Sequence, residues 1–210
     1  DLHLSLRRQR QMCIRDRYNF RIIMFIQTES TPNPNSLKFI LTDHELCEKP
    51  VEFNKSQDNR NSVLADELFK IKGVDNVLFN KNCISVNKND YTWDQLKASI
   101  LHVISNHLNS GLPAIDKRDD DINELDNIQF HDDDLKVVNM INSILLSKIR
   151  PAIMQDGGDV KFIKYESGTA YLSLKGSCAG CPSATVTLKN GIENMLKHNV
   201  PEVKKVEQVL

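Results

Sequence analysis

Residues 175–182 read Lys-Gly-Ser-Cys-Ala-Gly-Cys-Pro, with the two cysteines at positions 178 and 181. The residues before this stretch have the character of a strand, and those after it have the character of a helix. Because Cys178 and Cys181 have an i, i+3 spacing, both sulfur atoms can face one metal centre. Pro182 suits the first position of a helix, which would place Cys181 at a helix N-terminus, where the macrodipole favours a thiolate. The stretch therefore predicts thiolate chemistry in a loop between a strand and a helix.

The segments around this loop predict a small C-terminal domain. Alternating apolar residues favour strands, and apolar residues at helical spacing favour helices. The turn Asp156-Gly157-Gly158-Asp159 separates the first helix from the first strand, since glycine adopts positive φ without steric cost. The predicted elements are a helix over 135–149 that ends near Pro151, strands over 160–165 and 170–174, a helix over 182–197, and a strand over 203–209. Their order is α-β-β-α-β.

A second domain of the same class is predicted upstream. Ser62 suits a helix N-cap, and Leu64, Leu68 and Ile71 follow it at helical spacing. The predicted elements are strands over 25–28 and 36–41 joined by a turn at 31–35, a helix from Ser62, a hairpin of strands 74–79 and 83–86, and a helix over 93–108. The order β-β-α-β-β-α, with the C-terminal order, places the chain in the α+β class as two small domains.

The predicted domain limits are 24–109 and 135–210, joined by an acidic linker over 110–134. Residues 116–134 hold nine acidic and two basic residues, which predicts a solvated connector, with a docking surface for a basic partner as the alternative. Residues 1–23 hold six arginines and two acidic residues. We interpret them as an extraneous segment before a start at Met24, with a mitochondrial targeting segment as the alternative.

Composition narrows the class of protein. The net charge of -1 does not support nucleic-acid binding, which is typical of basic domains. No run approaches the ~18 apolar residues that a membrane span needs. The five cysteines are odd in number, and three of them (Cys13, Cys47 and Cys83) are scattered, which favours a reducing compartment over a disulfide framework. We found no set of residues typical of an active site and predict that the protein is not an enzyme.

A single Cys-x-x-Cys pair leaves several kinds of site open. A thioredoxin-like dithiol would use the pair without metal, although no aromatic residue precedes Cys178. A structural zinc site takes four ligands, so zinc would have to bridge two chains. Iron–sulfur clusters are usually held by four thiolates, and two chains related by a twofold axis would supply four. We therefore expect Cys178 and Cys181 to bind a cluster that bridges a homodimer, and Cys47 and Cys83 to be small hydrophobic residues.

Several longer stretches carry a family resemblance. The C-terminal half resembles the C-terminal domain of NifU in Arg150-Pro151 and in residues 156–160, 176–183, 187–193 and 201–203. The first half resembles the N-terminal domain of the Nfu proteins in residues 27–39, which include Thr31-Pro32-Asn33-Pro34-Asn35, and in residues 68–74 and 93–97. Two motif sets occur in the expected order, so the resemblance is specific.

The resemblance implies a function. It implies an iron–sulfur cluster scaffold or carrier that holds a 4Fe-4S cluster (2Fe-2S as the alternative) between two subunits through Cys178 and Cys181. Such a carrier transfers the cluster to apo iron–sulfur client proteins and receives it from upstream assembly proteins. We expect a bacterial cytoplasmic protein, with the mitochondrial matrix as the alternative. The Thr31–Asn35 segment is interpreted as a rigid turn, with contact to clients as the alternative.

Overall fold

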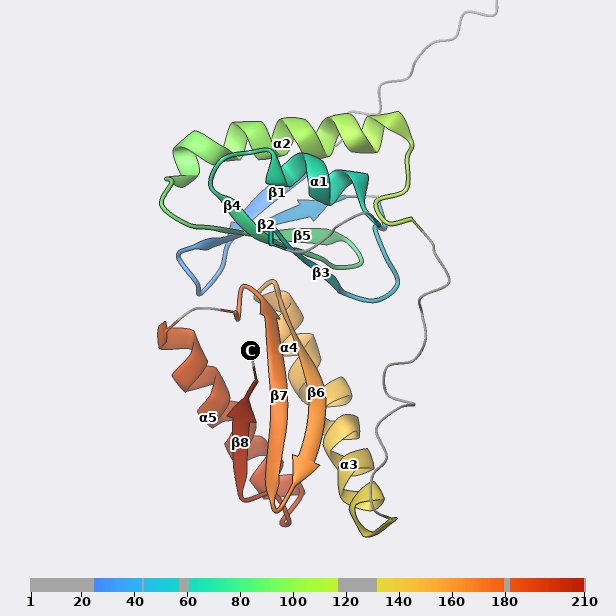
Figure 1. The fold of residues 1–210 in the computed structure, drawn as a ribbon, viewed down its shortest axis with the longest axis vertical. Helices are drawn as coiled ribbons and strands as arrows, with labels where there is room; N and C mark the ends of the chain where they lie inside the picture. The colour runs from blue at the N-terminus through green and yellow to red at the C-terminus, as the bar shows by residue number, and fades with distance from the viewer. Residues whose placement is uncertain (1–24, 43, 57–60, 117–131, 180–181, 210) are drawn as a thin grey trace, which may run out of the picture.

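The first half of the chain folds as one antiparallel sheet with two helices on one of its faces (Figure 1). The computed structural model describes residues 25–42, 44–56, 61–116, 132–179 and 182–209. The strands lie in the order β1-β2-β5-β4-β3. The elements of this N-terminal domain are β1 (Ile26–Ser30), β2 (Ser36–Leu41), β3 (Val51–Asn54), α1 (Val63–Phe69), β4 (Val74–Phe79), β5 (Cys83–Lys88) and α2 (Trp93–Ser110).

Strand alternation explains why one face of this sheet forms the core. In β2, Leu37, Phe39 and Leu41 belong to the buried apolar cluster, and the residues between them point to the other face. The helices cover the apolar face with Leu64, Leu68, Leu96, Ile100 and Ile104. As predicted, Ser62 is the N-cap of α1, and its side chain accepts a hydrogen bond from the backbone of Ala65 at 3.0 Å. Helix α2 ends at Gly111, whose φ is 70°.

One strand of this domain was not predicted. The sequence predicted no helix or strand between residues 41 and 62, but residues 51–54 form β3, which pairs antiparallel with β4 at the edge of the sheet. The strand has only four residues, Val-Glu-Phe-Asn, and Phe53 is its one buried residue. Phe53 contacts Phe79 with ring centroids 5.1 Å apart. A run this short carries too little alternation to be recognised before its partner strand is known.

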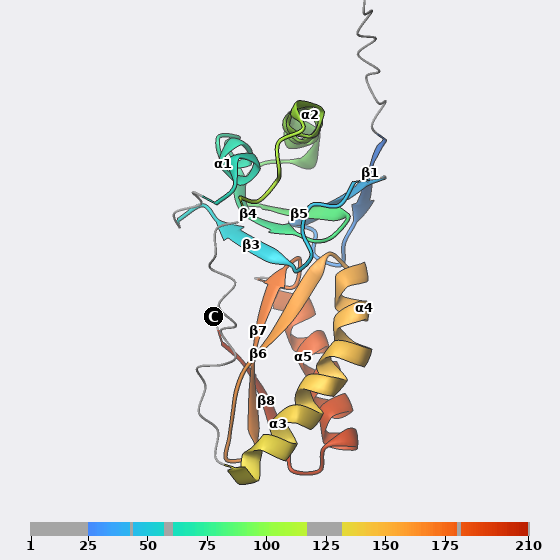
Figure 2. The same cartoon turned by 90° about the vertical axis from the view of Figure 1, so that its right-hand side faces the viewer.

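The second half of the chain folds as a three-stranded sheet with all of its helices on one face (Figure 2). Strands β6 and β7 form the predicted antiparallel hairpin, and β8 pairs parallel with β7 after the crossover through α5. The elements of this C-terminal domain are α3 (Asp132–Ile144), a π-helical turn (Leu145–Ile149), α4 (Arg150–Gln155), β6 (Gly158–Glu166), β7 (Thr169–Gly176), α5 (Pro182–Asn199) and β8 (Lys205–Gln208).

The sequence predicted that the first C-terminal helix ends near Pro151, and this prediction is wrong. The helical path continues to Gln155, because the chain widens into a π-helical turn just before the proline. There the backbone N–H of Arg150 donates to the carbonyl of Leu145, which is five residues back. Pro151 then occupies the first turn of α4, where its missing N–H is tolerated.

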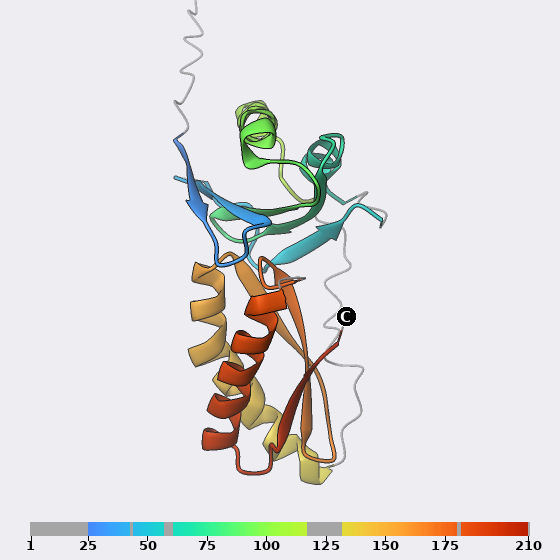
Figure 3. The same ribbon diagram turned by 90° about the vertical axis from the view of Figure 1, so that its left-hand side faces the viewer.

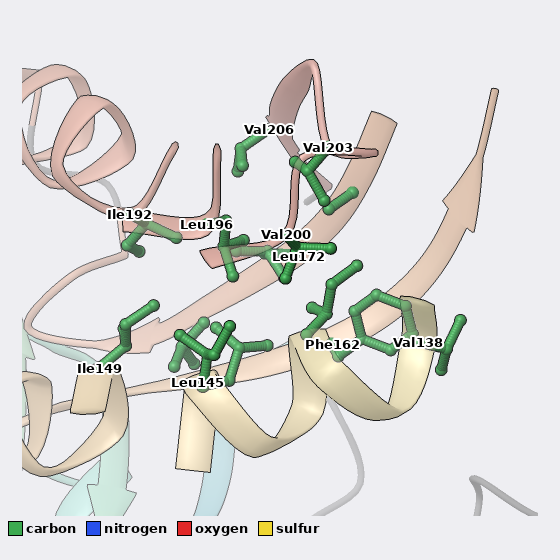
Figure 4. Packing of buried hydrophobic residues seen from close by; sticks show 14 of the residues in the cluster. Val138, Leu145, Ile149, Phe162, Leu172, Ile192, Leu196, Val200, Val203 and Val206 are labelled. Atoms are coloured by element: carbon green, nitrogen blue, oxygen red, sulfur yellow. The ribbon is translucent and has the colours of Figure 1, made fainter. Parts of the chain in front are cut away.

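The C-terminal core lies between the helices and the sheet. Helix residues Val138, Leu145 and Ile149 face Phe162 and Leu172 of the hairpin (Figure 4). Helix α5 and the chain after it close the cluster with Ile192, Leu196, Val200, Val203 and Val206. The predicted α+β class with two small domains is confirmed. The predicted limits at 109 and 134 remain predictions, and the segments 1–23 and 117–131 lie outside the described residues.

The two domains contact each other end to face. The uncovered face of the N-terminal sheet lies over one end of the C-terminal domain (Figure 3). This end holds the start of β6, the end of β7 and the start of α5. Strands β4 and β5 both contact β7. The end of β7 is also where the cysteine stretch begins. Within the described ranges, no helix is long and apolar enough to span a membrane.

Candidate functional site

The cysteine loop lies between β7 and α5, as predicted. Strand β7 ends at Gly176, a tight turn follows in which the Ala179 N–H donates to the Gly176 carbonyl at 3.0 Å, and α5 begins at Pro182. Cys178 therefore sits in the turn directly after the strand. Cys181, the second predicted ligand, lies outside the described residues together with Gly180. The structure thus places one of the two predicted thiols.

Hydrogen bonds to the preceding turn hold the residue next to Cys178. The Ser177 hydroxyl donates to the Asp156 carbonyl at 2.6 Å, and the Ser177 N–H donates to the Gly157 carbonyl at 3.2 Å. The Ser177 hydroxyl also lies 3.9 Å from the Cys178 sulfur. Cys178 itself is only 6% exposed and packs against the C-terminal core. The anchored Ser177 and the packing against the core together restrict the position of the Cys178 side chain.

Gly158 makes this position of the thiol possible. Gly158 pairs with Gly176 across the hairpin. A Cβ atom built at Gly158 would overlap the Cys178 sulfur, and it would lie 3.1 Å from the Lys175 carbonyl. Only glycine leaves room for the sulfur against the strand backbone. The second glycine of the predicted turn therefore shapes the site directly.

An ion pair fixes the last residue of that turn. Arg150 and Asp159 form a bidentate pair, in which Nε donates to Oδ1 at 2.6 Å and a terminal nitrogen donates to Oδ2 at 2.9 Å. Asp159 is 4% exposed. Two parallel hydrogen bonds define the orientation of both groups. The pair joins α4 to β6 and orients the end of the Asp-Gly-Gly-Asp turn, whose Asp156 and Gly157 carbonyls accept hydrogen bonds from Ser177 of the cysteine loop.

The two described cysteines of the N-terminal domain have a different environment. Burial raises the pKa of the Cys47 thiol to about 11, with the nearby Cys83 adding to the shift. Burial also raises the pKa of the Cys83 thiol. A protonated thiol is a poor metal ligand and a poor nucleophile. Within the described parts of the chain, no three or more His, Cys, Asp or Glu side chains are grouped so that they could hold a metal.

Residues of the N-terminal domain also contact the cysteine loop, and the sequence did not identify most of them. The Asn33 side-chain amide donates to the Ser177 carbonyl at 2.9 Å. The Asn87 amide donates to the Gly176 carbonyl at 2.8 Å, and the Gly176 N–H donates to a Glu52 carboxylate oxygen at 2.9 Å. Asn33 belongs to the motif that the sequence singled out, whereas Glu52 and Asn87 occupy ordinary polar positions in strands.

A pocket of about 390 Å³ lies where the two domains meet at Cys178. Its walls come from the Thr31–Asn35 turn, from the turn before β6, and from the cysteine loop with α5. The lining residues are Pro32, Asn33, Asp156, Ser177, Cys178, Thr187 and Leu188. The predicted ligand Cys178 thus faces a space that both domains enclose.

Comparisons with known proteins match both halves of the chain. The model of the NifU-like domain matches residues 141–207, and the model described as "Scaffold protein Nfu/NifU N terminal" matches residues 26–111. A "NifU-like protein" of Schizosaccharomyces pombe is 41% identical over 89% of this chain and 73% of its own length. The "NFU1 iron-sulfur cluster scaffold homolog, mitochondrial" of Homo sapiens is 42% identical over 89% of this chain and 72% of its own. The "NifU-like protein 5, mitochondrial" of Arabidopsis thaliana is 41% identical, over 90% and 69% respectively.

Proposed function

Because the chain belongs to the family of NifU-like proteins that carry an Nfu N-terminal domain, we propose that it is an iron–sulfur cluster scaffold. The observation that carries this proposal is the position of Cys178, held in a turn between β7 and α5 with its sulfur against Gly158. Relatives whose names include "iron-sulfur cluster scaffold" support the same function. The cluster is cargo in this proposal, and Cys178 and Cys181 are its ligands.

The number of ligands supports a shared site. One chain supplies two thiolates in the Cys178-x-x-Cys181 stretch, and iron–sulfur clusters usually take four. Two chains around a twofold axis complete the set, so the cluster bridges a homodimer. We propose a 4Fe-4S cluster, with 2Fe-2S as the alternative. Such a cluster loses half of its ligands when the dimer separates, which suits a protein that releases its cargo.

The same proposal defines partners and location. The protein receives clusters from upstream assembly proteins and transfers them to apo iron–sulfur proteins, without catalysing a reaction of its own. The names of the human and Arabidopsis relatives both include "mitochondrial". These names favour the mitochondrial matrix over the bacterial cytoplasm that the sequence analysis placed first.

Anaerobic reconstitution tests the ligands. The full chain is incubated with ferrous iron and sulfide, and native mass spectrometry and iron analysis follow. We expect about four iron atoms per dimer, and none bound after Cys178→Ser or Cys181→Ser. Cys47→Ser is the matched control, because that thiol has a raised pKa in the other domain, and this variant should bind like the parent chain. Retained cluster in Cys181→Ser, or a cluster on a strict monomer, would overturn the proposal.

A glycine pair tests the geometry around Cys178. Gly158→Ala keeps both cysteines but places a methyl group where the Cys178 sulfur lies, so cluster occupancy should fall several-fold. Gly191→Ala is the matched control, since a Cβ there meets nothing within 4 Å. Equal occupancy in the two variants would show that the described position of Cys178 is irrelevant to binding.

A metal-free thiol-exchange assay tests the alternative of a thioredoxin-like dithiol, which predicts activity without iron.

A further inference from the structure

The turn between β1 and β2 and the uncovered face of the N-terminal sheet both contact the C-terminal domain near Cys178 through hydrogen bonds to its backbone. Asn33 donates to the Ser177 carbonyl at 2.9 Å and reaches the Ala179 carbonyl at 3.5 Å. These two carbonyls flank Cys178 in the sequence. Lys38 of β2 adds a hydrogen bond to the carbonyl of Gln155, the last residue of α4, at 2.8 Å. The N-terminal domain therefore recognises the backbone on both sides of the thiol.

An apolar contact reinforces these hydrogen bonds. Leu78 of β4 has no exposed surface, yet it lies outside the apolar cluster of its own domain. A Cβ atom at Gly176 would lie 2.5 Å from Leu78 Cδ2, so the leucine touches the backbone at the end of β7. Leu78 thus owes its burial to the C-terminal domain.

The Thr31–Asn35 turn is rigid enough to act as a cover. The Asn33 carboxamide oxygen accepts from the Asn35 N–H at 2.9 Å, and the Thr31 hydroxyl donates to the Asn33 carbonyl at 2.9 Å. These bonds fix the Asn33 side chain with its amide nitrogen directed at the loop. Pro32 and Asn33 then form one wall of the pocket that Cys178 faces.

The interface between the two domains contains buried polar atoms, as reversible interfaces do. Four buried polar atoms on this sheet face have no hydrogen-bond partner within the described residues: Ser36 Oγ, Asn76 Oδ1, Ser85 Oγ and Asn87 Oδ1. A buried polar group without a partner costs about 1–3 kcal/mol, and this cost is recovered when the group returns to water. Polar contacts between domains are typical of domains that move relative to each other.

We propose that the N-terminal domain is a built-in, reversible cover of the Cys178 loop. In the covered arrangement the turn forms one wall of the pocket that Cys178 faces, so a second copy of the chain cannot bring its own thiols to Cys178 from that side. Opening exposes the loop and allows the cluster-bridged dimer to form. The competition with a second copy rests on the proposed function, whereas the cover itself does not.

A single-atom change in the turn tests the cover. Asn33→Asp keeps the oxygen that accepts from Asn35 but replaces the donating nitrogen with an oxygen facing two carbonyls. Loss of a buried hydrogen bond of this kind should raise the alkylation rate of Cys178 in the metal-free chain roughly tenfold. Asn35→Asp is the matched control, because it adds the same charge to an exposed position of the same turn.

Two other cysteines report on the same experiment. Cys83 lines a second pocket between Lys38 and Pro151, so opening should also raise its alkylation rate. Cys47 packs against the N-terminal core and should react at the same slow rate in every variant. Peptide mass spectrometry assigns each adduct to its cysteine. A faster Cys47 would show unfolding of the domain, and Leu78→Asp then provides the second test, with the exposed Val63→Asp as its control.

The outcomes separate the two proposals. Faster Cys178 labelling in Asn33→Asp and Leu78→Asp supports the cover, whether or not the chain binds a cluster. Equal labelling in these variants, in their controls and in the parent chain would overturn the cover, even if reconstitution yields the dimer. If the cover and the cluster site are both real, the two variants should form the bridged dimer at lower protein concentration than the parent.

Discussion

Both domains cover one face of their sheet with helices, but the second faces of the two sheets differ in exposure to solvent. Each packs helices against one face of a sheet to form its core. The second face of the N-terminal sheet is polar and buried, with Ser85 fully inaccessible and Lys38 only 9% exposed. The second face of the C-terminal sheet carries exposed ion pairs such as Lys164–Glu166. Polar alternation in a strand therefore does not decide whether its polar side meets water.

The largest expected effect is a difference in the free energy of unfolding between variants on the two faces of the N-terminal sheet. Ile84 and Leu78 are both fully buried, but Ile84 belongs to the apolar core whereas Leu78 contacts the other domain. Ile84→Ala should lower the free energy of unfolding of the N-terminal domain by about 2–5 kcal/mol through the cavity that it leaves. Leu78→Ala should lower it by less than about 1 kcal/mol, because the lost contact lies between the domains. Denaturation followed by the fluorescence of Trp93, the single tryptophan, measures both.

Equal losses in the two variants would break the comparison. They would mean that the N-terminal domain depends on the C-terminal domain for its own stability. The volume removed is similar in both substitutions, so the comparison isolates the side of the sheet.

The next effect concerns the thiols of the two domains. Burial first, and the neighbouring Cys83 second, raise the pKa of Cys47 from 9.0 to about 11. At pH 8 its thiolate population should therefore be roughly 100-fold below that of a thiol with the unshifted value. A raised pKa also means that the stability contributed by the protonated thiol is present below pH 9 and is lost as the pH rises through 11. Alkylation of Cys47, followed by peptide mass spectrometry from pH 7 to 11, should show a rate that rises about tenfold per unit.

A plateau near pH 9 would contradict this prediction and would indicate an exposed thiol. Cys47→Ser provides the control that assigns the adduct. The result would also sharpen the contrast with the C-terminal domain, since it shows whether the N-terminal thiols can compete as metal ligands.

Periodicity in the sequence predicted most of both cores but not the contact between them. The hairpin of β6 and β7 and the long helix α2 carry strong periodic patterns, and the structure confirms them. Strand β3 was missed because four residues at a sheet edge gain their conformation from β4. The helix was predicted to stop near Pro151 because proline usually ends a helix. The π-helical turn that lets the helix continue has no signature in local propensity.

The site was predicted in part, for a similar reason. The position of Cys178 between a strand and a helix follows from the sequence, because the spacing and Pro182 define the loop. The contacts of Asn87 and Glu52 with Gly176 could not be predicted, because each lies in a strand whose polar positions normally face water. Their burial depends on where the second domain lies, and no local pattern encodes that.

The smallest expected effect is on the exposed ion pairs of the C-terminal sheet. A hydrogen bond from Lys164, with its charge as the second cause, lowers the pKa of Glu166 below the usual range, and Lys205 does the same to Glu207. A lowered pKa means that any stability from these pairs is present at neutral pH and is lost as the pH falls through the folded-state pKa. Because both carboxylates are exposed, salt should screen the pairs. NMR titration of the Glu166 and Glu207 carboxyl groups should give low midpoints that move upward in about 1 M salt, where the Debye length is roughly 3 Å.

The same titration with Lys164→Met tests the assignment of each pair. The Glu166 midpoint should rise in this variant while the Glu207 midpoint stays, since Glu207 has its own lysine. Global stability should not change measurably, because solvated pairs contribute little. A measurable loss of stability would mean that this face is covered in solution, as the N-terminal face is, and would remove the difference between the two sheets.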